Sequence, residues 1–389
     1  MKDTPWPGAM SGYCSNVHAG SNLDETIANL AEHTLKVKQI VSPDEAMGVG
    51  LWLSAKSANA LVTQGRLSEF KAFLDGNGLV PFTFNGFPYG DFHAAVVKHE
   101  VYRPDWTSKQ RLDYTVELAN ILANLTDEGG HASVSTLPLG WPGQSRADWP
   151  CAEAAGQLLK LVDSLRSIEE KTGRYISAAL EPEPGCVLDT AEDVVEFFND
   201  HLLGKGRDET LLRYLGVCHD ICHSSVMFDN QRETIKTYAD AGINIFKVHV
   251  SSAVEADFSQ MPDRHTAEAL EQLKSFHEPK YLHQTSIRKG DYTLFYEDLI
   301  DAVEACGQNH LWRSHFHVPI YLESMGLLRP TQSDIIDAVK AIREYTDCRT
   351  FEIETYAWTV LPHRLQVPVL AEGIAAELKW FKETFSGSL

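Results

Sequence analysis

Short segments rich in β-branched and aromatic residues alternate along the chain with longer segments of helical period. The short segments predict strands, which we place at 12–17, 48–53, 80–85, 132–138, 175–181, 214–220, 243–250 and 350–355. The longer segments repeat apolar residues at i, i+3 and i+4 and predict helices, which we place at 23–38, 57–75, 107–126, 151–171, 190–203, 229–241 and 332–345. Eight strands that alternate with helices predict an α/β protein with a closed (β/α)8 TIM barrel, and leave a doubly wound open sheet as the alternative.

The segment between the seventh and eighth predicted strands is longer than one β/α unit needs. About 100 residues separate these two strands, where a few tens are typical. The segment contains predicted strands at 281–286 and 310–320 and a predicted helix near 293–306. We therefore expect one TIM-barrel domain over 1–389, with residues 251–330 inserted on the catalytic face.

Composition and charge narrow the class of protein. A hydrophobic content of 43% and a charged content of 23% are typical of a folded globular chain. The net charge of −20 repels a phosphate backbone, which argues against a nucleic-acid partner. The seven cysteines are odd in number and scattered, and favour reduced thiols in a cytoplasmic protein. The N-terminus, MKDTPWPGAMSGYC, has no apolar signal region, and no apolar run approaches the ~20 residues of a membrane span.

Ionisable residues lie at the ends of the fifth and sixth predicted strands, where barrels of this class carry their functional side chains. The fifth strand ends in a segment, LEPEPG, that places the carboxylates of Glu181 and Glu183 at its mouth, although either could also face solvent. The sixth ends in Cys218, Asp220 and His223, with Cys218 and Asp220 on one face. Because a matching second Cys/His pair is missing, we favour Asp220 as a barrel-mouth ligand over a zinc finger.

The seventh and eighth predicted strands add further ionisable residues. Lys247 and His249 share one face of the seventh strand, and Glu352 and Glu354 share one face of the eighth. Glu354 lies nearer the end of its strand, and Glu352 would support it or replace it. A lone histidine is more often a hydrogen-bonded core residue than a ligand, so His249 gains weight from the neighbouring carboxylates.

Three carboxylates and one imidazole form a ligand set that suits one divalent ion: Mn²⁺, Zn²⁺, Mg²⁺ or Co²⁺. Four protein ligands leave coordination positions open for two adjacent substrate oxygens. A metal bound in this way acidifies the C–H beside a carbonyl, while carboxylates remove and return the proton. This chemistry is that of an isomerase or epimerase of a small polyol or sugar-like molecule.

At these residues the chain resembles the xylose-isomerase-like TIM barrels, which include sugar phosphate isomerases and epimerases and endonuclease IV. The matching segments are LEPEPG, the C-x-D-x-x-H of strand six, KVHVSS and EIETY. The resemblance implies a single metal on Glu181, Asp220, His249 and Glu354. It also implies that Glu181 and Glu354 are the catalytic acid/base pair and that His223 touches the substrate.

Over nearly the whole chain, GYCSNVHAG, FNGFPYGDFH, LEPEPGCVLDT, HFHVP and ETYAW resemble the barrel member of the bacterial Ebo-cluster metabolite-traffic family. That resemblance implies a small-molecule substrate, and leaves open a homo-oligomer and partnership with other Ebo-cluster proteins. It also leaves open a carrier that binds a metabolite without reaction. A metal-dependent hydrolase is a third hypothesis, against which the net charge and the lack of an H-x-H on strand one both argue.

Further polar residues are predicted to line a substrate pocket, although each could equally serve loop packing. His315 and His317 form an H-x-H in the inserted segment, which would be a second metal pair. As alternating strand residues they contact the site with one face at most, where the strand runs past the edge of the site. The predicted substrate-binding residues are His223, Glu183, Asn16, His18, Asn85, Lys247, His315 and His317. Tyr89 and His93 are weaker candidates.

Overall fold

The computed structural model describes residues 9–307 and 309–386, and in this part of the chain eight parallel strands close into a barrel. The strands are β1 (Met10–Cys14), β2 (Met47–Leu51), β3 (Leu79–Asn85), β4 (His131–Thr136), β5 (Tyr175–Leu180), β6 (Leu215–Asp220), β7 (Ile245–Val250) and β13 (Thr350–Ile353). Hydrogen bonds close the ring in the order β1-β13-β7-β6-β5-β4-β3-β2. The predicted (β/α)8 barrel is confirmed, and the open doubly wound sheet is excluded.

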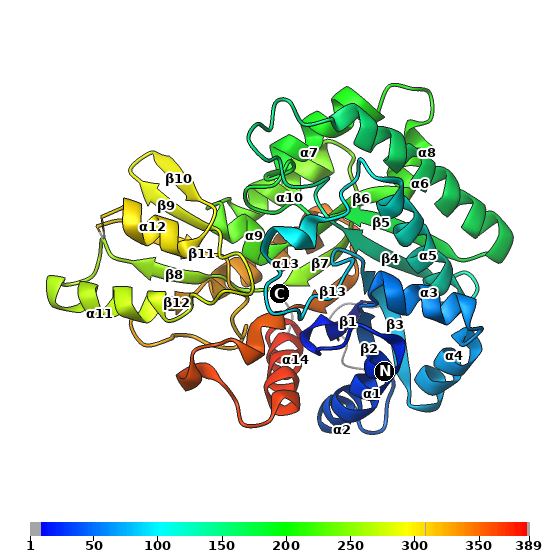
Figure 1. The fold of residues 1–389 in the computed structure, drawn as a ribbon, viewed down its shortest axis with the longest axis horizontal. Helices are drawn as coiled ribbons and strands as arrows, with labels where there is room; N and C mark the ends of the chain where they lie inside the picture. Colours follow the sequence, from blue (N-terminus) through cyan, green and yellow to red (C-terminus); the bar gives the residue numbers. More distant parts are fainter. Residues whose placement is uncertain (1–8, 308, 387–389) are drawn as a thin grey trace.

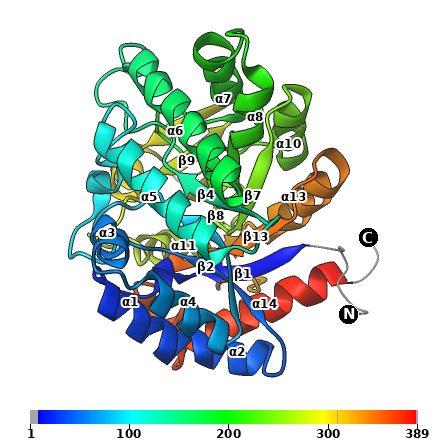
Figure 2. The same ribbon diagram turned by 90° about the vertical axis from the view of Figure 1, so that its right-hand side faces the viewer.

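Helices cover the outside of the barrel (Figures 1 and 2). They are α1 (Leu23–Asn29), α2 (Leu35–Val41), α3 (Ala55–Thr63), α4 (Leu67–Gly76), α5 (Lys109–Leu125), α6 (Cys151–Thr172), α7 (Ala191–Phe197), α8 (Asp208–Tyr214), α9 (Ile221–Val226), α10 (Gln231–Asp240), α13 (Gln332–Tyr345) and α14 (Leu370–Ser386). Within the described ranges, each helix is too short or too polar to span a lipid bilayer. The strands lie between helices and the barrel interior, which explains why Val49, Phe84 and Val248 are fully buried.

Several predicted boundaries are wrong for local reasons. The predicted helix 57–75 is two helices, α3 and α4, separated at Gly65, whose φ of 67° is left-handed and ends the first helix. The first predicted strand, 12–17, ends at Cys14 because Ser15–Val17 forms a 3-10 turn. The predicted helices 23–38 and 190–203 each include a π-helical turn, at Leu30–Thr34 and Phe198–Leu202.

The segment between β7 and β13 forms its own five-stranded sheet beside the barrel (Figure 1). Its elements are β8 (Val254–Asp257), α11 (Asp263–Lys274), β9 (Thr285–Lys289), β10 (Tyr292–Tyr296), α12 (Leu299–Ala305), β11 (Leu311–Ser314) and β12 (Arg329–Pro330), with the strands in the order β10-β9-β11-β8-β12. The predicted helix near 293–306 is wrong in its first part, because Tyr292–Tyr296 pairs with β9 in a hairpin.

The predicted strand 310–320 is also too long. Strand β11 ends at Ser314, and the chain then turns toward the barrel. The backbone N–H of His315 donates to the carbonyl of Gln284 at 2.8 Å, and the backbone N–H of Val318 donates to the carbonyl of Ser252 at 3.0 Å. The following residues therefore leave the inserted sheet and lie at the barrel mouth. Residues 1–8, 308 and 387–389 of the predicted 1–389 domain lie outside the described residues.

Candidate metal centre and pocket

Four ionisable side chains converge where four neighbouring strands end. Glu181 follows β5, Asp220 ends β6, His249 lies in β7 and Glu354 follows β13. One ligand atom from each of the four lies within 4.8 Å of those of the other three, and all four side chains are buried. The parallel order β13-β7-β6-β5 brings these strand ends together, so the four residues that the sequence analysis placed in one site do lie in one cluster.

Hydrogen bonds hold two of the carboxylates by one oxygen each. Asp220 caps α9, and its Oδ1 accepts from the backbone N–H of His223 at 2.9 Å and from Ser251 Oγ at 2.7 Å. Glu354 Oε1 accepts from Asn16 Nδ2 at 2.8 Å and from Asn85 Nδ2 at 2.7 Å. The second oxygen of each carboxylate is thereby left to face the centre of the cluster.

These remaining oxygens surround one nitrogen of His249. Its Nδ1 lies 3.0 Å from Glu181 Oε1, 3.3 Å from Glu354 Oε2 and 3.6 Å from Asp220 Oδ2. Three carboxylates this close to one another repel, and burial together with the carboxylates of Glu181 and Asp220 raises the pKa of Glu354 to about 7. Although burial alone would raise the pKa of Asp220, the imidazoles of His223 and His317 hold it well below its ordinary value.

The donor set fits a divalent cation. Glu181 Oε2 and Asp220 Oδ2 are buried and have no hydrogen-bond partner among the residues that the structure describes. A buried carboxylate oxygen without a partner is costly, and a cation between the oxygens would remove that cost. Three carboxylates and one imidazole match the preferences of Mg²⁺, Mn²⁺, Co²⁺ and Zn²⁺.

A fourth carboxylate, Glu352, holds the far side of the His249 ring. Its Oε2 accepts from His249 Nε2 at 2.8 Å and pairs with Lys247 Nζ at 2.5 Å, and all three side chains are fully buried. With Nε2 held by Glu352, Nδ1 faces the cluster, which is the orientation of a histidine metal ligand supported by a carboxylate. Lys247 also donates to Ser135 Oγ at 3.2 Å and is not among the residues that line the pocket.

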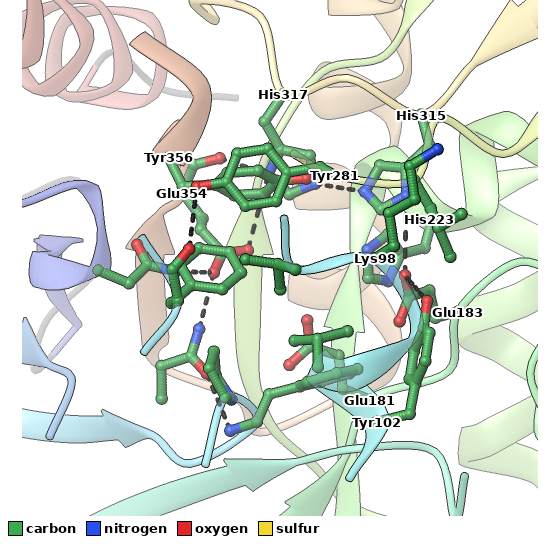
Figure 3. Close-up of a pocket in the computed structure, with 18 residues that line it drawn as sticks. Lys98, Tyr102, Glu181, Glu183, His223, Tyr281, His315, His317, Glu354 and Tyr356 are labelled. Carbon is green, nitrogen blue, oxygen red and sulfur yellow. Dashed lines mark hydrogen bonds and ion pairs between the residues drawn. The ribbon is translucent and has the colours of Figure 1, made fainter. Parts of the chain in front are cut away.

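A pocket with a cavity volume of ≈60 Å³ opens above the cluster (Figure 3). Since one water needs roughly 10–15 Å³ by this measure, the space admits a small ligand. Its polar lining is Asn16, Asn85, Lys98, Glu181, Glu183, His223, His315, His317 and Glu354, and its apolar and aromatic lining is Phe87, Pro88, Phe92, Val97, Val101, Tyr102, Tyr281, Leu282 and Tyr356. Six predicted substrate-binding residues are therefore in the wall: Asn16, Asn85, Glu183, His223, His315 and His317.

The structure places His18 elsewhere. Its Nε2 lies 2.9 Å from Tyr13 Oη, and its ring stacks on His33 at a centroid distance of 4.8 Å, so that it packs behind the pocket wall. The side chain of His93 contacts the backbone of Asn16, with its Nε2 2.6 Å from the carbonyl oxygen. Neither His18 nor Tyr89 lines the pocket above the cluster.

The prediction that His315 and His317 lie in a strand of the inserted segment is wrong. Both follow the end of β11 and both line the pocket, with their Nε2 atoms 3.1 Å apart. Burial lowers the pKa of His315 well below its ordinary value and that of His317 to about 4, so both are neutral at neutral pH.

Sequence reasoning missed Gln284 and the pocket tyrosines. Gln284 Nε2 donates to Glu183 Oε1 at 2.9 Å and to Tyr102 Oη at 3.1 Å, while its Oε1 lies 2.7 Å from His315 Nδ1. Tyr281 and Tyr356 pack at a centroid distance of 5.1 Å and form one wall. A single glutamine or tyrosine in a loop carries no periodic signal, so these residues could not be selected from the sequence.

Comparison with known proteins gives distant likeness only. No family model and no curated protein match the chain. The solved structures similar to it include a xylose isomerase-like TIM barrel protein from Mycobacterium smegmatis in complex with magnesium, with 13% identity over 98% of each chain and a TM-score of 0.49. An IOLI protein with a binding zinc atom has 13% identity over 97% of this chain and 98% of the other, with a TM-score of 0.47. A D-tagatose 3-epimerase-like protein has 14% identity over 96% of each chain, with a TM-score of 0.47.

At these sequence identities, the likeness to solved structures does not establish the substrate or the reaction of this chain. The narrower resemblance to the Ebo-cluster family finds no support in the comparisons. The chemistry of the chain is therefore argued from its own residues.

Proposed function

We propose that this chain is a divalent-metal-dependent isomerase or epimerase that acts on a small polyol, sugar-like or related metabolite. The observation that carries the proposal is the buried cluster of Glu181, Asp220, His249 and Glu354 at the base of a small pocket. A divalent ion held by these four residues would stabilise negative charge on substrate oxygens beside the C–H that is deprotonated.

The two glutamates are placed to move the proton. Glu181 follows β5 and Glu354 follows β13, with β6 and β7 between them, so that a ligand over the cluster has one carboxylate on each side. One carboxylate takes the proton from the substrate carbon, and the other returns a proton to the same or the neighbouring carbon. The amides of Asn16 and Asn85 hold Glu354 by one oxygen and keep the carboxylate in a fixed orientation.

The remaining polar lining serves to bind the substrate. His223 donates from Nδ1 to the carbonyl of Pro182 at 2.8 Å, which leaves its Nε2 to contact a ligand in the pocket. The aromatic side chains of Tyr281 and Tyr356 cover the opposite wall and keep bulk water from the reacting carbon. Because His315 and His317 come from the segment between β7 and β13, we further propose that residues 251–330 are an insertion on the catalytic face of a single domain.

The first experiment measures the affinity of the protein for a divalent metal. The purified wild-type protein is expected to bind a divalent metal tightly at this centre, and Glu181→Gln and Glu354→Gln are each expected to weaken binding at least tenfold. Glu377→Gln is the matched control, because it removes an equally buried carboxylate of α14 outside the cluster. Unchanged metal affinity in both cluster variants would remove the basis of the proposal.

The second experiment measures proton transfer. The metal-loaded protein is incubated in D2O with a panel of aldoses, ketoses and polyol-derived ketones, and deuterium at the carbon beside the carbonyl is followed by NMR. An isomerase or epimerase incorporates solvent deuterium there, whereas a carrier that only binds its ligand leaves the carbon unlabelled. Binding of a panel member without exchange would favour the carrier hypothesis.

A further inference from the structure

We propose that Arg111 is a positioning residue for the pocket, because it holds together both ends of the loop that follows β3. Residues 86–104 of this loop, which we call the pocket loop, supply much of the apolar and aromatic wall, including Phe87, Phe92 and Tyr102. Loops of this length are uncommon in compact domains and often carry function. The inference rests on the proposed function only in taking this pocket as the place of reaction.

Arg111 is an unusual residue for its position in α5. Its exposed fraction is 0%, and burial lowers the pKa of its guanidinium to about 10, so the side chain is still a cation at neutral pH. Within residues 9–307 and 309–386 its hydrogen bonds go to backbone carbonyls, and no carboxylate pairs with it. A buried cation without an anionic partner is costly, so an apolar side chain would serve better if Arg111 only filled space.

The three carbonyls that Arg111 contacts belong to the two ends of the pocket loop. Its Nη1 donates to the carbonyl oxygens of Gly86 at 2.8 Å and of Phe87 at 3.0 Å. Its Nε donates to the carbonyl oxygen of Pro104 at 2.8 Å. Because the guanidinium is planar and its donors have fixed directions, these bonds set the separation between the two ends of the loop.

The first of these ends is continuous with a residue that holds Glu354. Asn85 ends β3 and directly precedes Gly86. Its Oδ1 accepts from the backbone N–H of Phe87 at 3.1 Å, and its Nδ2 donates to Glu354 Oε1 at 2.7 Å. Arg111 therefore acts on the orientation of Glu354 through the backbone next to Asn85, without contacting the metal centre.

The second end supports the wall beside Glu183. Tyr102 lies two residues before Pro104, at the end of the 3-10 turn Lys98–Tyr102. Its Oη donates to Glu183 Oε1 at 2.8 Å, and Figure 3 shows the two side chains together at the edge of the pocket. The bond from Arg111 to Pro104 therefore holds the part of the backbone that places this tyrosine.

The middle of the pocket loop is held by the inserted segment instead. The backbone N–H groups of Val97 and Lys98 donate to the carbonyl of Lys280 at 2.8 and 3.0 Å, and Lys98 Nζ lies 2.8 Å from Asp298 Oδ2. Lys98 has a φ of 35°, a left-handed conformation that residues with a side chain rarely adopt, so these contacts keep the loop in place. Loss of Arg111 would free the two ends and leave the middle attached.

The first test follows hydrogen exchange of the backbone amides in the metal-free protein by mass spectrometry. Arg111→Met has a side chain of similar length with neither charge nor donor. Its exchange within residues 86–104 is expected to be at least about tenfold faster than in the wild type, while β5, β6 and β7 exchange as before. Arg174→Met is the matched control, because Arg174 also donates to backbone carbonyls, those of Thr126 and Thr172, and is expected to leave the pocket loop unchanged.

The second test connects the pocket loop to the metal centre. Protein loaded with Co²⁺ is mixed with excess EDTA, and the release of the metal is followed by absorbance. Arg111→Met is expected to release Co²⁺ about tenfold faster than the wild type, because the loop opens and Glu354 is held less firmly. Arg174→Met is expected to release it at the wild-type rate. A wild type that binds no Co²⁺ would refute the proposed function, while hydrogen exchange would still decide the role of Arg111.

Arg111→Lys separates the geometry of the guanidinium from its charge. Lysine keeps a cation at this position but has one nitrogen in place of the planar fork, so it is expected to show the same faster exchange and release as Arg111→Met. Wild-type behaviour in Arg111→Lys would overturn the inference. Faster exchange throughout the barrel in Arg111→Met, with no excess in residues 86–104, would also overturn it.

The wild type provides a further test that needs no variant. The amides of Phe87 and Arg103 lie near the two ends of the pocket loop, and each donates a hydrogen bond. If Arg111 joins the ends, both amides are expected to open in one step, and their exchange rates, measured by NMR, should depend in the same way on low concentrations of urea. Two different dependences would show that the ends open separately and would overturn the inference.

Discussion

Glu352 links metal binding to the stability of the barrel, and substitution can separate the two roles. Its carboxylate accepts from His249 Nε2 and pairs with Lys247 Nζ, and no part of the three side chains is exposed. Glu352→Gln keeps the shape of the side chain and removes its charge. Lys247 is then a buried cation without its carboxylate, and His249 loses an anionic acceptor.

Two magnitudes follow from these contacts. Removing one partner of a buried ion pair costs about 3–5 kcal/mol, so the metal-free Glu352→Gln protein should lose that much of its free energy of unfolding. Losing the carboxylate that orients a metal-bound histidine typically weakens metal affinity by about 10–100-fold. The double variant Lys247→Met/Glu352→Gln removes both charges, and should regain most of the stability while its metal affinity stays weak.

Urea unfolding in excess chelator measures the first quantity, and competition with a chromophoric chelator measures the second. Lys247→Met alone is the companion variant, because it leaves Glu352 in contact with His249. The reasoning would be refuted by a Glu352→Gln protein whose stability lies within about 1 kcal/mol of the wild type. A metal affinity within twofold of the wild type would equally refute it.

Two further predictions test groups around the centre. In Gly50→Ala the added Cβ would overlap Glu352 Oε1, so metal affinity should fall about 10–100-fold although every ligand remains. Gly156→Ala in α6, where an added Cβ meets no atom of the described residues within 4 Å, should leave the affinity unchanged, and equal affinities in the two variants would contradict the prediction. Burial raises the pKa of Glu377 to about 7 in the folded state, above an ordinary value near 4.5, so its contribution to stability is present below pH 4.5 and is lost as pH rises to 7. Between pH 4.5 and 7.5 the free energy of unfolding of the wild type should therefore fall by about 3 kcal/mol relative to that of Glu377→Gln, as measured by urea unfolding in chelator. A difference between the two proteins that does not change with pH would contradict the raised pKa.

The barrel and the main cluster could be predicted because both follow from periodicity. Alternation along a strand places Glu352 and Glu354 on one face, and the direction of the strand places Glu354 nearer the mouth. Parallel strands carry their carboxyl ends to the same end of the barrel. Residues such as Asp220 and His249 could therefore be placed together without knowledge of the contacts between them.

The rest of the site depends on long-range contacts that a local pattern does not encode. Asn16 and Asn85 donate to the same oxygen of Glu354 from positions 338 and 269 residues away in the chain. His18 is only two residues from Asn16 and packs behind the wall, because the 3-10 turn at Ser15–Val17 replaces the strand that would have set its direction.

The inserted segment shows the same limit. Residues 310–320 of this segment have the composition of a strand. The period of two along that predicted strand placed His315 and His317 on one face, which would contact the site only at its edge. The chain leaves the sheet after Ser314, when the backbone of His315 pairs with the carbonyl of Gln284, and both imidazoles then reach the pocket. Pairing with neighbouring strands sets where a strand ends, so the end of β11 at Ser314 could not be predicted from residue propensity alone.

The most direct test of the account is a crystal structure of the metal-loaded protein with anomalous scattering recorded at the absorption edge of the metal. The account predicts an anomalous peak enclosed by Glu181, Asp220, His249 and Glu354, with His249 Nδ1 about 2.0–2.1 Å from the ion if it is zinc. Metal that is present in the crystal but absent from this position, with His249 Nδ1 still hydrogen-bonded to Glu181, would contradict the central claim.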